Sequence, residues 1–371
     1  MPKIVLTNVT KQWGKFIGVN DMTLEIEDGS FVTLLGPSGC GKTTTLRMIA
    51  GLETPTRGEI RFDDTIVFSS EQNINVPAAK REVGFLFQNY ALWPHMTVTQ
   101  NIAFGLETLK WKKSDISARV AEMLKTLKIE QFADRYPAEL SGGQQQRVAI
   151  ARTLAPKPRM LFMDEPLSNL DAKLRGEMRT ELKRLHKDTG STFVYVTHDL
   201  LEAMTLSSRI CMMTEGRLQQ YAPPLEVYNH PANMFVADFV GNPTMNIVEA
   251  KAAKSGTGTA EIDFLGRKAV FQAENDFEMK SENVSVGIRP EFLAISPAGD
   301  IEGLAYSTLP AGMETTVKIK VGQTILSSVI FGAIDYETDT PIRFSVAGAG
   351  ILLFDRESGD NIAIGRLAIR Q

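Results

Sequence analysis

A glycine-rich loop between an apolar strand and a helix constrains this chain more than any other feature. The run Phe31 to Leu35 is almost wholly apolar, and a helical pattern of apolar residues opens at Leu46. Glycines between them let backbone N–H groups turn toward a phosphate, and the helix start adds unpaired donors and a favourable dipole. This strand-loop-helix setting predicts a phosphate-binding loop. Its candidate nucleotide-binding residues are Gly36, Pro37, Ser38, Gly39, Cys40, Gly41, Lys42, Thr43 and Thr44.

Three side chains of this loop carry specific expectations. Lys42 is placed to reach the β and γ phosphates of a nucleoside triphosphate, and the Thr43 hydroxyl is placed to ligate Mg²⁺. Cys40 lies inside the loop, and a helix start lowers the pKa of a nearby thiol. We therefore expect Cys40 to react with thiol reagents and bound nucleotide to protect it.

The size and composition of the chain indicate a globular protein of two domains. Its 371 residues exceed one ordinary domain, and its 43% hydrophobic and 23% charged content is typical of soluble proteins. No apolar run approaches the roughly 18 residues that span a bilayer, and the N-terminal stretch lacks a secretion signal, so we expect a cytosolic chain. Cys40 and Cys211 are too few for a disulfide framework or a four-cysteine zinc site.

The charge distribution argues against nucleic acid as a partner. Residues 1–240 hold 28 basic and 27 acidic side chains, and residues 241–371 hold 12 and 17. Neither part has the basic excess on which phosphate-backbone binding depends. We therefore predict no nucleic-acid partner.

Apolar patterning divides the chain into an α/β domain at 1–240 and a β domain at 241–371. Within the first, the stretch of about 90–155 has apolar residues at helical spacing and predicts an α-helical insertion. Strand-like and helical runs alternate elsewhere in this domain, which favours a mainly parallel sheet covered by helices. The second domain shows short strand-like runs broken by Gly, Pro and Asp, which is typical of a small, all-β, OB-like barrel.

A second apolar strand, Met160 to Met163, ends in the acidic pair Asp164 and Glu165. A nucleotide site needs a carboxylate near its metal, so Asp164 is the candidate ligand of Mg²⁺, directly or through water. Glu165 is the candidate general base, or the group that orients water, for attack on the γ phosphate. Taken alone, the pair could equally cap the turn that follows.

Between these elements lies the sequence LSGGQQQR at residues 140–147, at the start of another helical pattern. Ser141 followed by two glycines at a helix start forms a second anion-binding site. Because the chain already holds one phosphate loop, this second site suggests that two chains share each nucleotide. The alternative, in which Ser141 only caps its own helix, stays open on this motif alone.

Together these motifs resemble those of the ABC ATPases. The segment at 140–147 is the discriminating one, because many NTPases have the phosphate loop whereas this serine-glycine motif is typical of ABC proteins. The resemblance implies an ABC-type P-loop cassette with a helical insertion, an ATPase activity that yields ADP and phosphate, and ATP and Mg²⁺ as cofactors. The motifs stand in the family's order at Gly36 to Thr44, Gln88, Leu140 to Arg147, Asp164-Glu165, Ser168 to Asp171 and His198.

The resemblance further implies a head-to-tail dimer, of two copies or of this chain with a related one, that holds two ATP molecules at its interface. Gln88 would contact Mg²⁺ and the attacking water, His198 would contact the γ phosphate, and Asp171 would help to shape the opposite half-site. Trp13 resembles the aromatic residue that stacks on adenine, although packing at a strand edge explains it as well. The second chain's contacts to the nucleotide would come from Ser141, Gly142, Gly143 and Gln144.

Residues 1–240 look like the ATPase subunits of bacterial sugar importers, including the maltose and glycerol-phosphate systems. The stretch 88–97 would line a groove for a helix of a membrane subunit, Val240 to Asn246 looks like the family's junction, and Gly287 to Glu291 like a motif of its β domain. The implied partners are two transmembrane permease subunits and, through them, a periplasmic or extracellular solute-binding protein. The chain would be peripheral, at the cytoplasmic face of the cell membrane.

In that family the β domain holds the two ATPases together and can bind regulators. Residues 241–371 would accordingly form a regulatory and dimerisation domain. For Arg289-Pro290-Glu291 we expect a turn with a local ion pair.

Three other functions stay open at this stage. The same ATPase could serve the import of a polyamine, an osmolyte or an oxyanion, because nothing in the chain needs to touch the solute. A soluble ABC protein that acts on DNA or ribosomes is a different class, which the single cassette and the balanced charge oppose. A non-hydrolysing scaffold is opposed by the presence of Lys42, Glu165 and His198.

Overall fold

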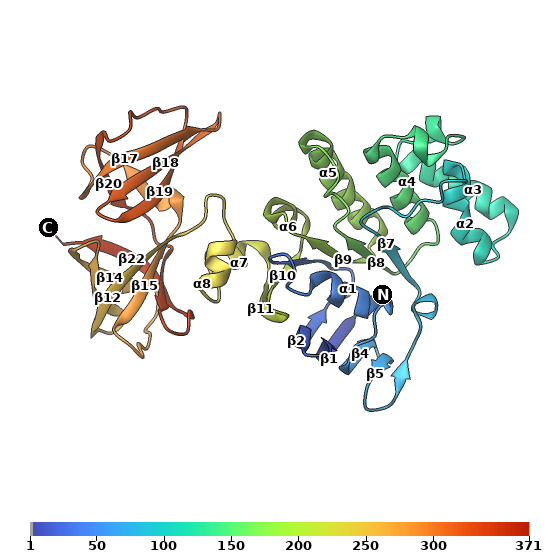
Figure 1. Ribbon diagram of the computed structural model, residues 1–371, viewed down its shortest axis with the longest axis horizontal. Helices are drawn as coiled ribbons and strands as arrows, with labels where there is room; N and C mark the ends of the chain where they lie inside the picture. Colours follow the sequence, from blue (N-terminus) through green and yellow to red (C-terminus); the bar gives the residue numbers. More distant parts are fainter. Residues whose placement is uncertain (1–2, 371) are drawn as a thin grey trace. The chain divides into compact units, whose positions relative to one another are not determined.

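Two compact units make up the chain. The computed structural model describes residues 3–370, and the units are Met1–Pro224 and Leu225–Gln371 (Figure 1). The sequence predicts a boundary at 240, whereas the units separate at 224. The difference arises because the short helices α7 (Pro224–Asn229) and α8 (Met234–Phe239) pack with the second unit. The backbone N–H of Met234, for example, donates to the carbonyl oxygen of Gly359.

A six-stranded, mainly parallel sheet in the order β11-β10-β3-β9-β8-β7 forms the centre of the first unit. Strands β3, β8 and β9 are buried along their whole length, which suits a sheet covered on both faces and explains their near-continuous apolar sequences. The predicted parallel sheet is confirmed. Its strands are β3 (Phe31–Leu35), β7 (Val83–Leu86), β8 (Met160–Asp164), β9 (Thr192–Thr197), β10 (Arg209–Thr214) and β11 (Arg217–Ala222).

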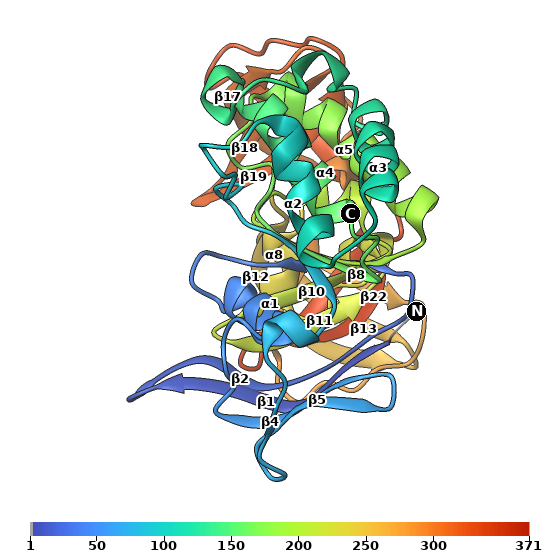
Figure 2. The ribbon, with the colours of Figure 1, turned by 90° about the vertical axis from the view of Figure 1, so that its right-hand side faces the viewer.

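A second, antiparallel sheet in the order β2-β1-β4-β5-β6 packs on the other side of α1 (Lys42–Ala50). Figure 2 shows α1 between the two sheets. Leu46 and Ile49 of α1 share one apolar core with Ile4 and Leu6 of β1 and Val32 of β3, so two sheets fix the helix that starts in the phosphate loop. The strands are β1 (Ile4–Trp13), β2 (Phe16–Ile26), β4 (Arg57–Phe62), β5 (Thr65–Ser69) and β6 (Ile74–Asn75).

Helices occupy the stretch that predicts a helical insertion. They are α2 (Val98–Thr108), α3 (Lys113–Thr126) and α4 (Gly142–Leu154), with short 3₁₀ turns at η2 (Glu130–Phe132) and η3 (Pro137–Glu139); a further 3₁₀ turn, η1 (Ala78–Lys80), precedes the stretch. Helices α5 (Ala172–Thr189) and α6 (Leu200–Leu206) cover the parallel sheet, and Met178 of α5 packs in one core with Phe193 of β9. Within residues 3–370, no helix is long and apolar enough to cross a membrane.

The second unit combines a closed barrel with a further sheet around one core. The barrel order is β12-β13-β14-β22-β21-β15, and the five-stranded sheet order is β16-β20-β17-β18-β19. Phe271 of the barrel and Phe344 of the sheet belong to the same buried cluster. The predicted all-β barrel is confirmed, and the second sheet adds to it. The elements are β12 (Asn246–Gly256), β13 (Thr259–Phe264), β14 (Arg267–Ala273), β15 (Asn283–Ile288), η4 (Pro290–Phe292), β16 (Leu293–Ile295), β17 (Ile301–Pro310), β18 (Glu314–Val321), β19 (Thr324–Phe331), β20 (Pro341–Val346), β21 (Ile351–Asp355) and β22 (Asn361–Ile369).

Arg289 anchors short helices of the second unit instead of forming the expected pair with Glu291. Its buried guanidinium donates to the carbonyl oxygens of Ala237 and Tyr228 at 3.0 and 2.7 Å, and to that of Val240. Glu291 accepts a hydrogen bond from the Tyr228 hydroxyl at 2.8 Å. The expected turn is present as η4, but the arginine serves the carbonyl ends of α7 and α8, where the helix dipoles favour a cation.

Arg81 fixes the C-terminal end of α1 from inside the first unit. Its guanidinium donates to the carbonyl oxygens of Met48 and Ile49 at 2.9 and 2.8 Å and to that of Val76 at 2.8 Å. The residue is 3% exposed, and burial lowers the pKa of its guanidinium to about 10. The group therefore stays charged at neutral pH and forms strong, charge-assisted hydrogen bonds.

Replacing Arg81 with Met should destabilise the first unit by about 3 kcal/mol, because buried carbonyls lose their charged donors. Urea unfolding followed by tryptophan fluorescence measures this effect selectively, since Trp13, Trp93 and Trp111 all lie in the first unit. The matched control is Arg61→Met, whose side chain is 40% exposed and lies 4.0 Å from Glu59. We expect it to cost less than about 0.5 kcal/mol. Equal unfolding midpoints for the two variants would refute the role of Arg81.

Candidate functional site

Adjacent strands of the parallel sheet bring the predicted nucleotide residues to one edge. Strand β9 lies between β3 and β8, with Leu35 opposite Thr197. The phosphate loop follows β3, Glu165 follows β8, and His198 follows β9. Because the carboxyl ends of parallel strands meet at the same edge, segments far apart in sequence become neighbours there.

Two glycines of the phosphate loop have backbone positions that no other residue would fill. Gly36 has φ +154°, and a Cβ there would lie 2.1 Å from the carbonyl oxygen of Met213. Gly41 has φ +100°, and a Cβ there would lie 2.4 Å from the carbonyl oxygen of Gly18. Gly41 is also the N-cap of α1 without a side-chain cap, so the first backbone N–H groups of the helix stay available to a phosphate.

Lys42 is buried with its ammonium folded back over the loop. Its Nζ donates to the carbonyl oxygens of Gly36 and Pro37, each at 2.8 Å. An ammonium has three donors and no fixed geometry, so it can exchange these neutral carbonyls for phosphate oxygens without breaking an ion pair.

Thr43 and Asp164 form an oxygen ligand pair beside the loop. The Thr43 hydroxyl donates to Asp164 Oδ1 at 2.7 Å, and an Arg47 nitrogen lies 3.3 Å from Asp164 Oδ2. A hydroxyl and a carboxylate this close fit Mg²⁺, which takes one or two carboxylates together with substrate phosphates. Among residues 3–370, no group of three or more His, Cys, Asp or Glu side chains is placed so that it could hold a metal ion.

Gln88 and His198 contact the Glu165 carboxylate from two sides. Gln88 Nε2 donates to Glu165 Oε2 at 3.2 Å, and His198 Nδ1 lies 3.5 Å from Glu165 Oε1. Glu165 adopts φ +45°, which is uncommon for a residue with a side chain, and its backbone N–H donates to the carbonyl oxygen of Val196 at 3.0 Å. The structure thus brings Glu165, Gln88 and His198 together.

Ser141 and Asp171 occupy the starts of α4 and α5. Ser141 Oγ accepts from the backbone N–H of Gln144 at 3.4 Å, and Asp171 Oδ1 accepts from that of Leu174 at 3.0 Å. A Cβ at Gly143 would lie 2.1 Å from the Leu174 side chain, so the two helix starts pack closely. These residues form a group of their own, and no hydrogen bond recorded among the described residues joins them to the phosphate loop.

The Ser141 group is open on its outer side. A Cβ added at Gly142 would meet no atom within 4 Å. The helix start therefore has room to receive an anion from outside the chain.

Trp13 lies at the end of β1 with its ring 41% exposed. It pairs with Phe16 across the strands, with ring centroids 6.2 Å apart, and Lys11 Nζ lies 5.1 Å from its ring centre. Trp13 therefore packs at the strand edge, and its contact with adenine stays a prediction.

The expectation that Cys40 is reactive is wrong. The side chain is 3% exposed and belongs to the apolar core below the loop. Burial raises the pKa of its thiol, and the nearby Lys42 charge offsets this only in part. A thiol that is buried and protonated is a poor nucleophile, whatever the helix start contributes.

An apolar groove lies beside the loop that carries Gln88. Its volume is about 650 Å³, and its lining includes the aromatic residues Phe85, Phe87, Trp93 and Phe104. Arg152 shapes its rim by donating to the carbonyl oxygens of residues 90 and 91 at 2.8 and 2.6 Å.

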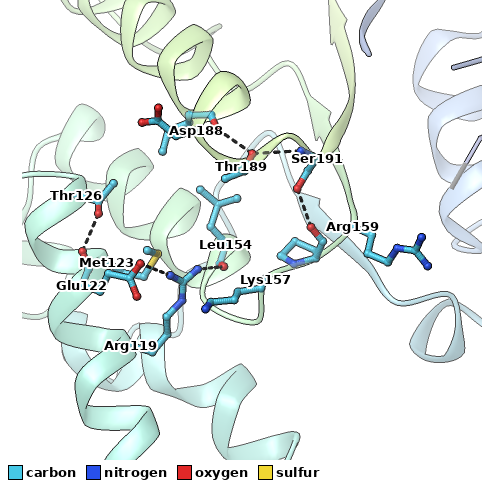
Figure 3. Close-up of a pocket in the computed structure, with 12 residues that line it drawn as sticks. Arg119, Glu122, Met123, Thr126, Leu154, Lys157, Arg159, Asp188, Thr189 and Ser191 are labelled. Carbon is cyan, nitrogen blue, oxygen red and sulfur yellow. Dashed lines mark hydrogen bonds and ion pairs between the residues drawn. The ribbon is translucent and has the colours of Figure 1, made fainter. Parts of the chain in front are cut away.

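A separate cavity of about 490 Å³ opens between α3, the turn after α4 and the end of α5 (Figure 3). Arg119 lines one side of it, with Nε donating to the carbonyl oxygen of Ala155 at 2.9 Å and a terminal nitrogen 2.7 Å from Glu122. None of the residues that line it belongs to the nucleotide motifs. Arg119 thus ties α3 to the C-terminal end of α4.

Sequence reasoning missed two arginines of the site, Arg47 and Arg175. Arg47 follows Thr43 by four residues on α1, a helical spacing that places both on the side of Asp164. Arg175 follows the N-cap Asp171 by four residues and contacts Asp199 at 3.3 Å. Asp199 and Glu202 are spaced as the N-cap and third residue of a helix, and this spacing was the sequence signal that Asp199 begins α6, where Arg175 contacts it.

Sequence comparisons give the chain's relatives. The ABC transporter family model matches residues 19–168. The maltose/maltodextrin import ATP-binding protein MalK of Escherichia coli K12 is 44% identical over 327 residues, which cover 86% of this chain and 86% of that protein. The trehalose/maltose import ATP-binding protein MalK of Thermococcus litoralis is 49% identical over 299 residues, which cover 79% of each.

Solved structures agree with these relatives. An ATP-binding cassette in a dimeric post-hydrolysis state, bound to ADP and phosphate, has a TM-score of 0.53 and 34% sequence identity. The match covers 60% of this chain and 98% of that one. Together with the site geometry, these relatives show that the chain belongs to the ABC transporter ATPases, in the group of the maltose and trehalose import ATP-binding proteins.

Proposed function

We propose that this chain hydrolyses ATP between two copies of itself and that the hydrolysis drives the import of a sugar or sugar derivative through a membrane permease. The observation that carries the proposal is the gathering of Thr43, Asp164, Glu165, Gln88 and His198 beside a phosphate loop. The ATPase activity also follows from the family to which the chain belongs.

Nucleotide binding uses the backbone of the phosphate loop and two side chains. The N–H groups at the start of α1 bind the phosphates, and Lys42 moves its ammonium from the carbonyls of Gly36 and Pro37 to the β and γ phosphates. Trp13 stacks on the adenine ring, which any aromatic face can do without reading the base.

Thr43, Asp164 and Gln88 would hold Mg²⁺ when ATP is bound. The Thr43 hydroxyl has lone pairs left for an ion while its proton is donated to Asp164. Mg²⁺ neutralises charge on the phosphate oxygens. Arg47 keeps the other oxygen of Asp164 turned away from the phosphates.

Hydrolysis needs a base, an oriented water and charge stabilisation. Glu165 takes one proton from the attacking water while the water oxygen bonds to the γ phosphorus. The bond between that phosphorus and the bridging oxygen of ADP then breaks. Gln88 orients the water, and His198 and Lys42 stabilise the negative charge on the transferred group. Gln88 and His198 already contact the Glu165 carboxylate, so little rearrangement is needed.

The second half of each site comes from a second copy. Ser141, Gly142, Gly143 and Gln144 bind the phosphates of the partner's ATP, and Asp171 shapes the opposite half-site. Two observations support this arrangement, namely the open outer side of Gly142 and the dimeric state of a similar cassette bound to ADP and phosphate.

The apolar groove beside Gln88 is the site where a permease helix binds. Each copy contacts one of two permease subunits, which act with a periplasmic or extracellular solute-binding protein, so the chain works at the cytoplasmic face of the cell membrane. Because the groove adjoins the Gln88 loop, closure around ATP moves the bound helix. We assign residues 1–240 to the ATPase domain and residues 241–371 to a regulatory and dimerisation domain.

Glu165→Gln should keep ATP binding and lower turnover by at least about 100-fold, because the proton acceptor is lost. The variant should also accumulate as an ATP-bound pair, since hydrolysis normally releases it. Phosphate release and light-scattering mass with and without ATP measure both effects. The control Glu177→Gln, on an exposed turn of α5, should behave as wild type. Normal turnover would refute the role of Glu165 as the base. Nucleotide binding without pairing of two copies would refute the shared nucleotide site.

Trp13→Ala should raise the Kd for ATP about tenfold, because stacking on a base contributes about 1–3 kcal/mol. GTP affinity should fall by a similar factor, since stacking does not read the base. Trp13→Phe should recover most of the affinity. Tyr136, 46% exposed in the same unit, provides an aromatic control in Tyr136→Ala. An unchanged Kd for Trp13→Ala, measured by calorimetry, would leave only the strand-edge role.

Phe104→Glu should prevent the chain from co-purifying with two membrane subunits, because a charge cannot enter an apolar groove without a partner. Leu109→Glu, at the end of the same helix and outside the groove lining, should still co-purify. Vesicles that carry the intact complex should accumulate labelled maltose, which tests the sugar assignment. Uptake of putrescine without uptake of sugar would replace the sugar assignment with a polyamine. Failure of the wild-type chain to co-purify with any membrane subunit would favour a soluble ABC protein.

A further inference from the structure

Arg175, near the start of α5, joins two loops of the site. Its guanidinium donates to the carbonyl oxygen of Leu170 at 3.1 Å and to the Asp199 carboxylate at 3.3 Å. Leu170 directly precedes Asp171, and Asp199 directly follows His198. One planar side chain therefore sets the distance between the Asp171 loop (residues 165–171) and the His198 loop (residues 197–199).

The Asp199 end of this link is anchored in the core. Asp199 Oδ1 accepts from the backbone N–H of Glu202 at 3.0 Å, and the Asp199 N–H donates to Thr197 Oγ1 at 3.0 Å. Glu202, 3% exposed, accepts from the hydroxyls of Tyr195 and Thr197, both at 2.7 Å. A displacement of Asp199 therefore moves the whole His198 loop, because Asp199 and Thr197 are both hydrogen-bonded to Glu202.

One donor of Arg175 lacks a hydrogen bond in this arrangement. Its Nε is buried, has no hydrogen-bond partner among the described residues, and lies 3.8 Å from Glu202 Oε1. Charge-assisted hydrogen bonds form at about 2.8 Å, so a relative shift of about 1 Å would complete this one. The guanidinium thus has a second arrangement within reach, in which it lies closer to Glu202 of α6.

We propose that Arg175 is a positioning residue that couples the Asp171 loop to the His198 loop. The inference rests on the proposed function, in which Asp171 faces the nucleotide site shared with the second copy and His198 faces the nucleotide held by its own copy. Pairing displaces the Asp171 loop, and Arg175 carries that displacement to His198. Each site therefore becomes competent only when the opposite copy has closed on it.

A plain brace between α5 and α6 exists elsewhere and provides the control. Lys183 Nζ donates to the carbonyl oxygen of Thr205 at 2.9 Å. Lys183 is a cation on the same helix as Arg175 and holds the same neighbouring helix, but no contact recorded for the described residues joins it to either loop. Lys183→Met removes bracing without touching the proposed coupling.

The test compares ATP turnover of the full chain with that of Arg175→Met, Arg175→Lys and Lys183→Met. Arg175→Met should lower kcat about tenfold or more while the KM for ATP stays within about twofold, because the phosphate loop is intact and only positioning is lost. Arg175→Lys keeps the charge but lacks the planar fork, so its kcat should lie between the two. Lys183→Met should match wild type. Equal losses for Arg175→Met and Lys183→Met, or a wild-type kcat for Arg175→Met, would overturn the inference.

Epistasis with His198 separates coupling from stability. If Arg175 acts through His198, adding Arg175→Met to His198→Ala causes no further loss in single-turnover rate, whereas a multiplicative loss contradicts the coupling. Asp199→Asn covers the case in which Arg175→Met fails to fold, because asparagine keeps the size and the capping oxygen and removes only the charge. We expect the same fall in kcat for Asp199→Asn, and an unchanged kcat would count against the link.

Glu165→Gln distinguishes failure of this inference from failure of the proposed function. If Glu165→Gln hydrolyses ATP normally, or if two copies of it never pair in the presence of ATP, the proposed function fails. If Glu165→Gln is inactive and pairs as expected while Arg175→Met keeps its turnover, only the role of Arg175 fails. In the Glu165→Gln background, Arg175→Met should still pair with ATP, since the phosphate loop and the Ser141 helix start remain.

Discussion

The hydrogen bond from Thr43 to Asp164 joins residues 121 positions apart, and the rest of the site depends on the strand arrangement that makes it possible. Strands β3, β9 and β8 are neighbours, run parallel and end at one edge. Each strand end therefore delivers one functional element, namely the phosphate loop, the histidine and the acidic pair. Only a fully buried parallel sheet holds three such ends together, because both faces are fixed by helices.

Charges at this edge are arranged so that a nucleotide meets little resistance. Lys42 is held by neutral carbonyl oxygens, so the arriving phosphate replaces hydrogen bonds of moderate strength and no carboxylate has to be displaced. Asp164 would repel a phosphate, but it is bonded to Thr43 and lies near Arg47. In the proposed site, Lys42 and the helix N–H groups would face the phosphates, while Asp164 and Glu165 would face the metal and the water.

Much of this arrangement follows from the sequence because it depends on local patterns. Strand-loop-helix periodicity, the paired glycines and the acids after an apolar strand specify their own surroundings. The expectation for Cys40 fails because it considers only the helix start, whereas the direction of the side chain, which a loop sequence does not show, takes the thiol into the core. Arg175 and Arg289 were missed or misassigned because their partners come from other elements, and the sheet formed by 293–346 depends on pairings between distant strands.

The two interpretations of Ser141, a helix cap or a phosphate ligand, are compatible at the level of single atoms. As a cap, its oxygen only accepts a hydrogen bond, from the N–H of Gln144, so the hydroxyl proton remains to be donated. A phosphate of a second chain's nucleotide can accept that proton without disturbing the helix. Because such a nucleotide bridges two chains, it binds the pair more tightly than either copy alone, and mass action then requires ATP to promote pairing. In the proposed function, the groove beside Gln88 would pass the free energy of that closure to a membrane helix, since Phe87 of the groove directly precedes Gln88.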